Sequence, residues 1–112
     1  MVMSRFALAV VLGFAGCARA LAEDGDVARG HRLFLADGCA GCHGTVGQGG
    51  PGVRLAPSPL PASGMAAYIR DPAGEMPPYT SKVVGDADVR DIHAYLASVP
   101  APPKVADIPE LH

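Results

Sequence analysis

The sequence predicts a small all-α domain of three to four helices and long loops, with a non-protein group filling part of its interior. Two segments carry apolar residues at helical spacing, and no segment alternates apolar and polar residues as a half-buried strand does. The 14 glycines and 11 prolines among 112 residues favour long loops between the helices. With three tyrosines, three phenylalanines and no tryptophan, the apolar core is thin. Small domains of this kind usually add a disulfide, a metal or a large apolar ligand.

Length, charge and cysteine count disfavour several classes of protein. A chain of 112 residues is typical of one small domain rather than of a multidomain enzyme. Nine basic and eleven acidic residues, with no run of like charge, lack the basic patch that neutralises nucleic-acid phosphates. Three cysteines are too few, and odd in number, for a disulfide framework. We therefore expect no nucleic-acid partner.

The N-terminal segment has the pattern of a secretory signal peptide. Arg5 precedes an apolar run over residues 6–22, and acidic residues follow directly. Ala20 and Ala22 are the small residues that a signal peptidase requires, so we expect residues 1–22 to be a signal peptide, cleaved after Ala22. The mature protein is then exported to the periplasm.

A membrane anchor at this end is disfavoured. Arg19 interrupts the apolar run before it reaches the roughly 20 residues that span a bilayer. Phe14-Ala15-Gly16-Cys17 resembles a bacterial lipoprotein signal, so a lipid anchor at Cys17 is the alternative. It is less favoured because Phe14 stands where an aliphatic residue is usual. Loss of Arg5 and Arg19 with the signal peptide changes the formal net charge from −2 to −4.

A first helix is predicted to begin after Asp26 and to end at Gly38. Asp26 is a good N-cap residue, Phe34 lies on the apolar face, and glycine commonly follows the end of a helix. Gly30 lies in the middle of this helix, where glycine costs up to about 1 kcal/mol relative to alanine. A close crossing with another helix would compensate for this cost, and we expect Tyr95 to be the partner in it. The alternative is a tolerated surface glycine.

Cys39-Ala40-Gly41-Cys42-His43 is the attachment pattern of c-type haem. Each cysteine can add across a haem vinyl group to form a thioether, and the adjacent histidine then becomes the proximal ligand of the iron. A thioredoxin-like redox pair would need a βαβ pattern, and a zinc site would need two more ligands at short spacing. Neither is present. We therefore expect one haem c, bound covalently through Cys39 and Cys42, with His43 ligating the iron.

The segment after this motif, residues 44–64, is rich in glycine and proline and has no periodicity. Such long irregular segments are uncommon in compact domains unless they are functional, so we expect this one to wrap around the haem. Pro51 follows His43 by eight residues, and its carbonyl is expected to accept a hydrogen bond from the second ring nitrogen of His43. The alternative is an ordinary turn proline in Gly50-Pro51-Gly52.

Two further helices follow in the second half of the chain. A short one is predicted from Gly64 to Arg70, with Ser63 as its N-cap. A longer one is predicted from Ala87 to Val99, with Asp86 as its N-cap and a proline directly after it. The apolar stripe of this last helix comprises Val89, Ile92, Leu96 and Val99, with Tyr95 beside it.

The second axial position of the iron needs its own ligand, and Met76 is the preferred candidate. It lies in Glu75-Met76-Pro77-Pro78-Tyr79, where two prolines stiffen an extended loop that can present the thioether opposite His43. Met65 falls inside the short helix, where an unbranched apolar side chain is more often part of the core. The remaining candidates are expected at the surface: His31, His93 and His112.

Taken together, these motifs resemble the class I c-type cytochromes of the small bacterial monohaem type. The resemblance covers Asp26 to Val99. It implies a cytochrome c fold over residues 23–99, with the first and last helices packed together and with His43 and Met76 as iron ligands. A proline-rich C-terminal tail, residues 100–112, follows the domain.

The chain departs from the family in several respects. The stretch between His43 and Met76 is short, tryptophan is absent, and Lys82 and Lys104 are the only lysines. The missing tryptophan leaves the contacts of the haem propionates open. Three side chains are candidates for them: Arg54, Tyr68 and Tyr79.

An iron with both axial positions filled favours outer-sphere electron transfer over oxygen or peroxide chemistry. We therefore expect an electron-transfer protein rather than an enzyme. It would be a periplasmic single-electron carrier, either a soluble shuttle or the small cytochrome subunit of an exported dehydrogenase, and its partners would be redox proteins. A peroxidase-like enzyme whose Met76 dissociates and a haem-based gas-binding protein are the alternatives, disfavoured because no distal acid–base pair is evident near Met76.

Overall fold

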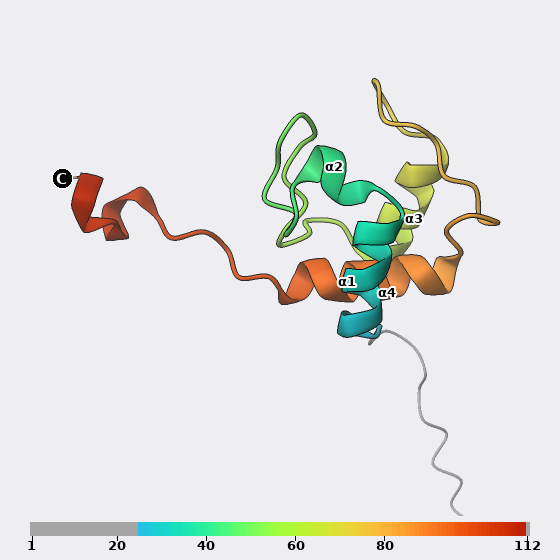
Figure 1. Cartoon of the computed structure of the whole chain (residues 1–112), viewed down its shortest axis with the longest axis horizontal. Helices are drawn as coiled ribbons and strands as arrows, with labels where there is room; N and C mark the ends of the chain where they lie inside the picture. Colours follow the sequence, from blue (N-terminus) through green and yellow to red (C-terminus); the bar gives the residue numbers. More distant parts are fainter. Residues whose placement is uncertain (1–24, 112) are drawn as a thin grey trace, which may run out of the picture.

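The computed structural model describes residues 25–111, and these form four α-helices, two short 3-10 helices and long loops (Figure 1). The predicted signal peptide, Cys17 and His112 lie outside the described residues. No strand occurs between residues 25 and 111, so the predicted all-α class is confirmed. The elements are α1 (Val27–Ala36), α2 (Cys39–His43), α3 (Ala62–Arg70), α4 (Asp86–Ser98), η1 (Val105–Asp107) and η2 (Pro109–Leu111).

Helices α1 and α4 cross at close range, as Figure 1 shows, and Gly30 lies at the crossing point. Gly30 is buried, and a Cβ atom placed on it would overlap the carbonyl oxygen of Asp91 and lie 2.9 Å from the backbone nitrogen of Ile92. The predicted close crossing is therefore confirmed. At Gly30 itself, the contact is the backbone of α4 at Asp91 and Ile92. Tyr95, the predicted partner, takes part in the same crossing, because its ring stacks on His31 of α1 with the centroids 4.5 Å apart and packs against Phe34.

Polar contacts fix the register of this crossing. Asp26 caps α1 as predicted, since its carboxylate accepts a hydrogen bond of 2.9 Å from the backbone N–H of Arg29. The guanidinium of Arg29 pairs with the carboxylates of Asp88 and Asp91 on α4. The Arg29 hydrogen bond lowers the pKa of Asp88, with a smaller contribution from the backbone N–H of Gly85. A charged fork thus joins the same two helices that meet at Gly30.

The N-termini of α3 and α4 differ from the predicted ones. Helix α3 begins at Ala62 with Pro61 as its N-cap, so the predicted cap Ser63 lies inside the helix. Proline suits this position because its fixed φ of −67° with ψ of 161° is extended, and it has no N–H to satisfy.

Helix α4 begins one residue before the predicted start, with Gly85 as its N-cap. The carboxylate of Asp88 reaches back and accepts a hydrogen bond of 3.0 Å from the Gly85 N–H. Asp86, the predicted cap, is therefore the first residue of the helix, and its carboxylate accepts a hydrogen bond of 2.9 Å from Arg70 of α3.

The apolar core lies where α1, α4 and the loops meet. Phe34 of α1 and Leu96 of α4 have no exposed surface, and Val89 is 1% exposed. The other buried apolar residues of the core are Ala56, Val84, Ile92 and Tyr95. Among the helices that the structure describes, none combines the length and the apolar character needed to cross a bilayer.

Candidate cofactor site

A cavity of about 700 Å³ opens beside the core, and every α-helix contributes to its wall. Its size is within the range of about 300 to 1,000 Å³ that is typical of ligand and cofactor sites. Phe34, Val89 and Leu96 form part of both the core and this wall. The remaining apolar side chains of the wall include Leu55, Met65, Ile69, Val84 and Ile92. A large apolar group in the cavity would complete the thin core that the composition predicts.

Helix α2 places both cysteines of the attachment motif at this cavity. Cys39 and Cys42 are free thiols that line the wall, and their spacing of three residues puts them on one side of the helix. Burial, together with the nearby carboxylate of Asp37, raises the pKa of the Cys39 thiol to about 11. The thiol is therefore protonated at neutral pH, in contrast to the reactive thiolate of a disulfide oxidoreductase.

The His43 ring is buried in the same wall, and its orientation is fixed by one hydrogen bond. Its Nδ1 lies 2.7 Å from the carbonyl oxygen of Val53. Because a carbonyl can only accept, Nδ1 carries the proton, and Nε2 keeps its lone pair for a metal. The prediction that the carbonyl of Pro51 accepts this hydrogen bond is therefore wrong, because the acceptor lies two residues later in the chain.

The turn around Pro51 explains this difference. The N–H of Gly50 donates to the carbonyl of Gly52 over 2.9 Å, and the N–H of Gly52 donates to the carbonyl of Cys42 over 2.8 Å. These bonds close the turn against α2 and bring the next carbonyl, that of Val53, to the ring. Gly52 is required for the close approach, since a Cβ on it would lie 2.8 Å from Cε1 of His43.

Both methionine candidates line the cavity, but they belong to different surroundings. Met65 lies on α3 and packs against the core cluster. Met76 lies in the irregular loop between α3 and α4 and is part of the cavity wall. The structure thus brings the predicted ligand Met76 into one cavity with Cys39, Cys42 and His43.

The chain matches the family model of "Cytochrome C oxidase, cbb3-type, subunit III" over residues 25–96, from the start of the described region to the last turn of α4. It belongs to this family of c-type cytochrome domains. The resemblance predicted from the motifs is confirmed, and the small all-α cytochrome c fold is confirmed by the helices and their packing. No curated protein was found to match the chain.

A cytochrome c domain implies haem c and haem-based electron transfer, and the residues of this cytochrome fit that cofactor. The wall is mainly apolar, α2 carries two free thiols at Cys39 and Cys42, and His43 offers an oriented ring nitrogen. Across residues 25–111, no three His, Cys, Asp or Glu side chains gather closely enough to hold a metal ion. The zinc alternative therefore finds no ligand set in this part of the chain.

The loop that carries Met76 is tied to the rest of the cytochrome at Tyr79. The backbone N–H of Tyr79 donates to the carbonyl of Ile69 over 2.8 Å, and Arg70 donates to the Tyr79 carbonyl over 3.0 Å. The Tyr79 hydroxyl donates to the carbonyl of Asp37 over 2.9 Å, at the end of α1. Its only O–H is thus engaged. The other two candidates for propionate contacts, Arg54 and Tyr68, line the cavity with exposed side chains.

The histidines that were considered as distal ligands lie elsewhere. His31 is exposed on α1 and stacks on Tyr95. Nε2 of His93 lies 2.8 Å from the carbonyl oxygen of Leu60. As far as residues 25–111 show, neither histidine lines the cavity.

Two features of the site were not found from the sequence. Val53 was missed as the partner of His43 because nothing in the residue type marks a backbone carbonyl as an acceptor. Asp37 was missed as a buried carboxyl group: within the described residues its Oδ2 atom is buried without a hydrogen-bond partner. Burial, with a smaller contribution from Asp88, raises the pKa of Asp37.

Proposed function

We propose that this cytochrome is a periplasmic single-electron carrier that holds one haem c through thioethers at Cys39 and Cys42. His43 and Met76 are the proposed iron ligands. The observation that carries the proposal is the hydrogen bond from Nδ1 of His43 to Val53, which leaves Nε2 as a ligand in the cavity that both cysteines and Met76 line.

The chain's own residues would hold and insulate this group. When bound, a haem c supplies one-electron oxidation and reduction at its iron. The Val53 carbonyl holds the His43 ring in one tautomer and one orientation, as outer-shell partners of ligating histidines do. The apolar wall would shield the group from water, and with both His43 and Met76 bound to the iron no coordination site would stay open, which favours electron transfer over peroxide or gas chemistry.

Docking of a redox partner is supported by apolar side chains at the cavity. Val53, Leu60 and Tyr68 line it, yet they are 73%, 44% and 45% exposed. Electron-transfer partners usually meet over small, weak interfaces, and a mainly apolar contact suits this purpose. With two lysines in the sequence, the chain cannot form a ring of lysines around the haem edge. Its partners would therefore be redox proteins with a neutral or basic docking surface.

Two forms of this function are compatible with the site. One is a soluble shuttle, and the other is the small cytochrome subunit of an exported dehydrogenase or related redox complex. The family description, which names an oxidase subunit, supports the second form. The pattern of residues 1–22 supports export to the periplasm.

Acid–acetone extraction of the protein, followed by mass spectrometry, tests the covalent haem. We expect one haem mass to stay with the polypeptide, and replacement of both Cys39 and Cys42 by serine should release it. Carbon monoxide added to the reduced native protein tests the filled axial position, and we expect no spectral change. Extraction of the haem from the unmodified protein would refute the attachment, whereas rapid carbon monoxide binding would favour the gas-binding or peroxidase-like alternatives.

A further inference from the structure

The residues that follow α4 form an arm that leaves the cytochrome domain. The family match ends at residue 96, and Figure 1 shows the chain after α4 running away from the other helices. Pro100, Pro102 and Pro103 fix φ at their own positions and hold the residues before them extended. Beyond this stiff spacer, η1 and η2 pack against each other and against no other helix of the described chain.

The arm carries two parallel rows of side chains. Val105, Ile108 and Leu111 are three residues apart, and the 3-10 hydrogen bonds Ile108 N–H to Val105 (3.2 Å) and Leu111 N–H to Ile108 (3.1 Å) place them on one side. Val105 is 66% exposed and Leu111 59% exposed. Asp107 and Glu110 have the same spacing and form an acidic row next to the apolar one. Within the arm, no contact offsets the free-energy cost of holding the apolar row ordered and exposed to water.

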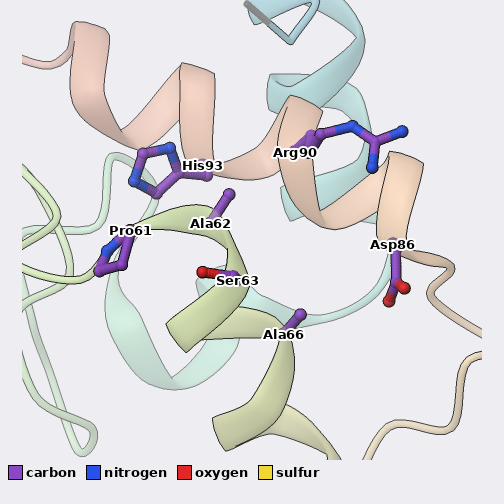
Figure 2. Close-up of a pocket in the computed structure, with 7 residues that line it drawn as sticks. All are labelled: Pro61, Ala62, Ser63, Ala66, Asp86, Arg90 and His93. Carbon is purple, nitrogen blue, oxygen red and sulfur yellow. The ribbon is translucent and has the colours of Figure 1, made fainter. Parts of the chain in front are cut away.

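A second pocket of the domain has complementary features. It has a volume of about 570 Å³ and lies between α3 and α4 (Figure 2). The small side chains of Ala62 and Ala66 leave room on the α3 side, while Arg90 and His93 line the pocket from α4. Because Arg90 and His93 are three residues apart, they lie on the same side of α4.

The arm and this pocket match in length and in charge. The row from Val105 to Leu111 is about 12 Å long at the 3-10 rise of 2.0 Å per residue. The edge of α4 from Asp86 to His93 is about 10 Å long. The two acids of the arm can face the guanidinium of Arg90, beside His93, whose Nε2 lies 2.8 Å from the carbonyl oxygen of Leu60. Asp86, the acidic residue of the pocket lining, is already paired with an arginine of α3.

We propose that the arm of one protomer lies in the α3–α4 pocket of a second copy of this chain, so that two copies exchange arms. In the structure, the arm of the same chain runs away from the helices that line this pocket (Figure 1). Residues 99–103 extend about 15 Å beyond α4, and the apolar row, turned back, returns only about 12 Å. Arg90 lies a further 12 Å or so back along α4 from Ser98.

The exchange predicts a weak dimer. Two short arms bury less than the roughly 800 Å² per partner of a standard interface, so we expect a dissociation constant of about 0.1 mM. Sedimentation equilibrium of the haem-loaded protein, from about 10 µM to about 1 mM, measures it directly.

Charge reversal tests which surfaces are in contact. Arg90→Glu alone, or Asp107→Lys with Glu110→Lys, should each weaken the dimer about tenfold, because attraction becomes repulsion at both copies of the contact. A mixture of these two variants should dimerise like the unmodified protein, since both arms of the mixed pair then face opposite charges. Lys82→Glu changes the charge by the same amount as Arg90→Glu but lies outside the arm and the pocket; it is the control and should leave the dimer unchanged.

Three results would overturn the proposal. The first is a protein that stays monomeric over the whole concentration range. The second is a dimer that neither charge reversal weakens, or one that the mixture does not restore. The third is an arm whose amide resonances respond to Arg90→Glu to the same extent at every protein concentration, which would place it in the pocket of its own chain.

Discussion

Replacing Gly30 with alanine tests whether the crossing of α1 and α4 holds the cytochrome domain together. The added Cβ would overlap the backbone carbonyl of Asp91, and a backbone atom cannot move aside as a side-chain tip can. The helices must separate, which loosens the packing of Phe34 against Leu96 and strains the Arg29 ion pairs. Overpacking of this kind costs up to about 3 kcal/mol, while alanine returns about 1 kcal/mol of helix propensity. We expect a net loss of about 2 kcal/mol in the free energy of unfolding.

Denaturant unfolding of the haem-loaded variants, followed by circular dichroism, measures this loss. Gly64→Ala is a matched control in α3, because a Cβ there would meet its nearest neighbour at 3.4 Å, an ordinary contact. It should stabilise the protein slightly, by up to about 1 kcal/mol. If Gly30→Ala stabilises the protein as much as Gly64→Ala does, the close crossing does not constrain the fold and the reasoning fails.

The other predictions concern the iron ligand, a buried acid and the docking surface. Met76→Ala should abolish the weak red absorption band of thioether-ligated ferric haem and open the iron to cyanide, whereas Met65→Ala should retain both properties; the reverse pattern would assign the ligand to Met65. Asp37→Asn should unfold at a higher denaturant concentration than the unmodified protein at pH 7. Burial raises the pKa of Asp37 above its ordinary value of 3.8. Ionisation of Asp37 therefore lowers the stability of the unmodified protein as the pH rises through the folded-state pKa, and the two proteins should be equally stable below pH 3.8. A stability difference of the same size at pH 7 and below pH 3.8 would contradict this cause. Electron transfer with a physiological donor should slow only modestly with salt, or as expected for an acidic cytochrome with a basic partner, and neither Lys82→Glu nor Lys104→Glu should change the rate strongly. A steep loss with salt together with a large drop in both variants would show that these lysines steer docking.

Local sequence patterns were sufficient for much of the fold and for the family of the domain. The spacing of Cys39, Cys42 and His43 identifies the attachment motif without any tertiary information, because all three side chains lie within one helical turn and a half. The cap at Asp26 and the buried stripe of Val89, Ile92 and Leu96 were also predicted correctly, since both depend on residues at most a few positions apart. Val99, the fourth residue of the predicted stripe, is instead the half-buried C-cap, because α4 ends at Ser98. Gly30, in the middle of the first helix, also correctly predicted a close helix crossing.

What the tertiary structure decided are the contacts between segments that are distant in the chain or that depend on backbone geometry. Val53 rather than Pro51 holds the ring of His43, because two backbone hydrogen bonds close the intervening turn against α2. Gly30 meets Asp91 because the Arg29 fork and the packed core together set where α1 crosses α4. A backbone carbonyl has the same chemistry at every residue, so no residue type can reveal which one accepts a given hydrogen bond. Only the folded path of the chain selects it.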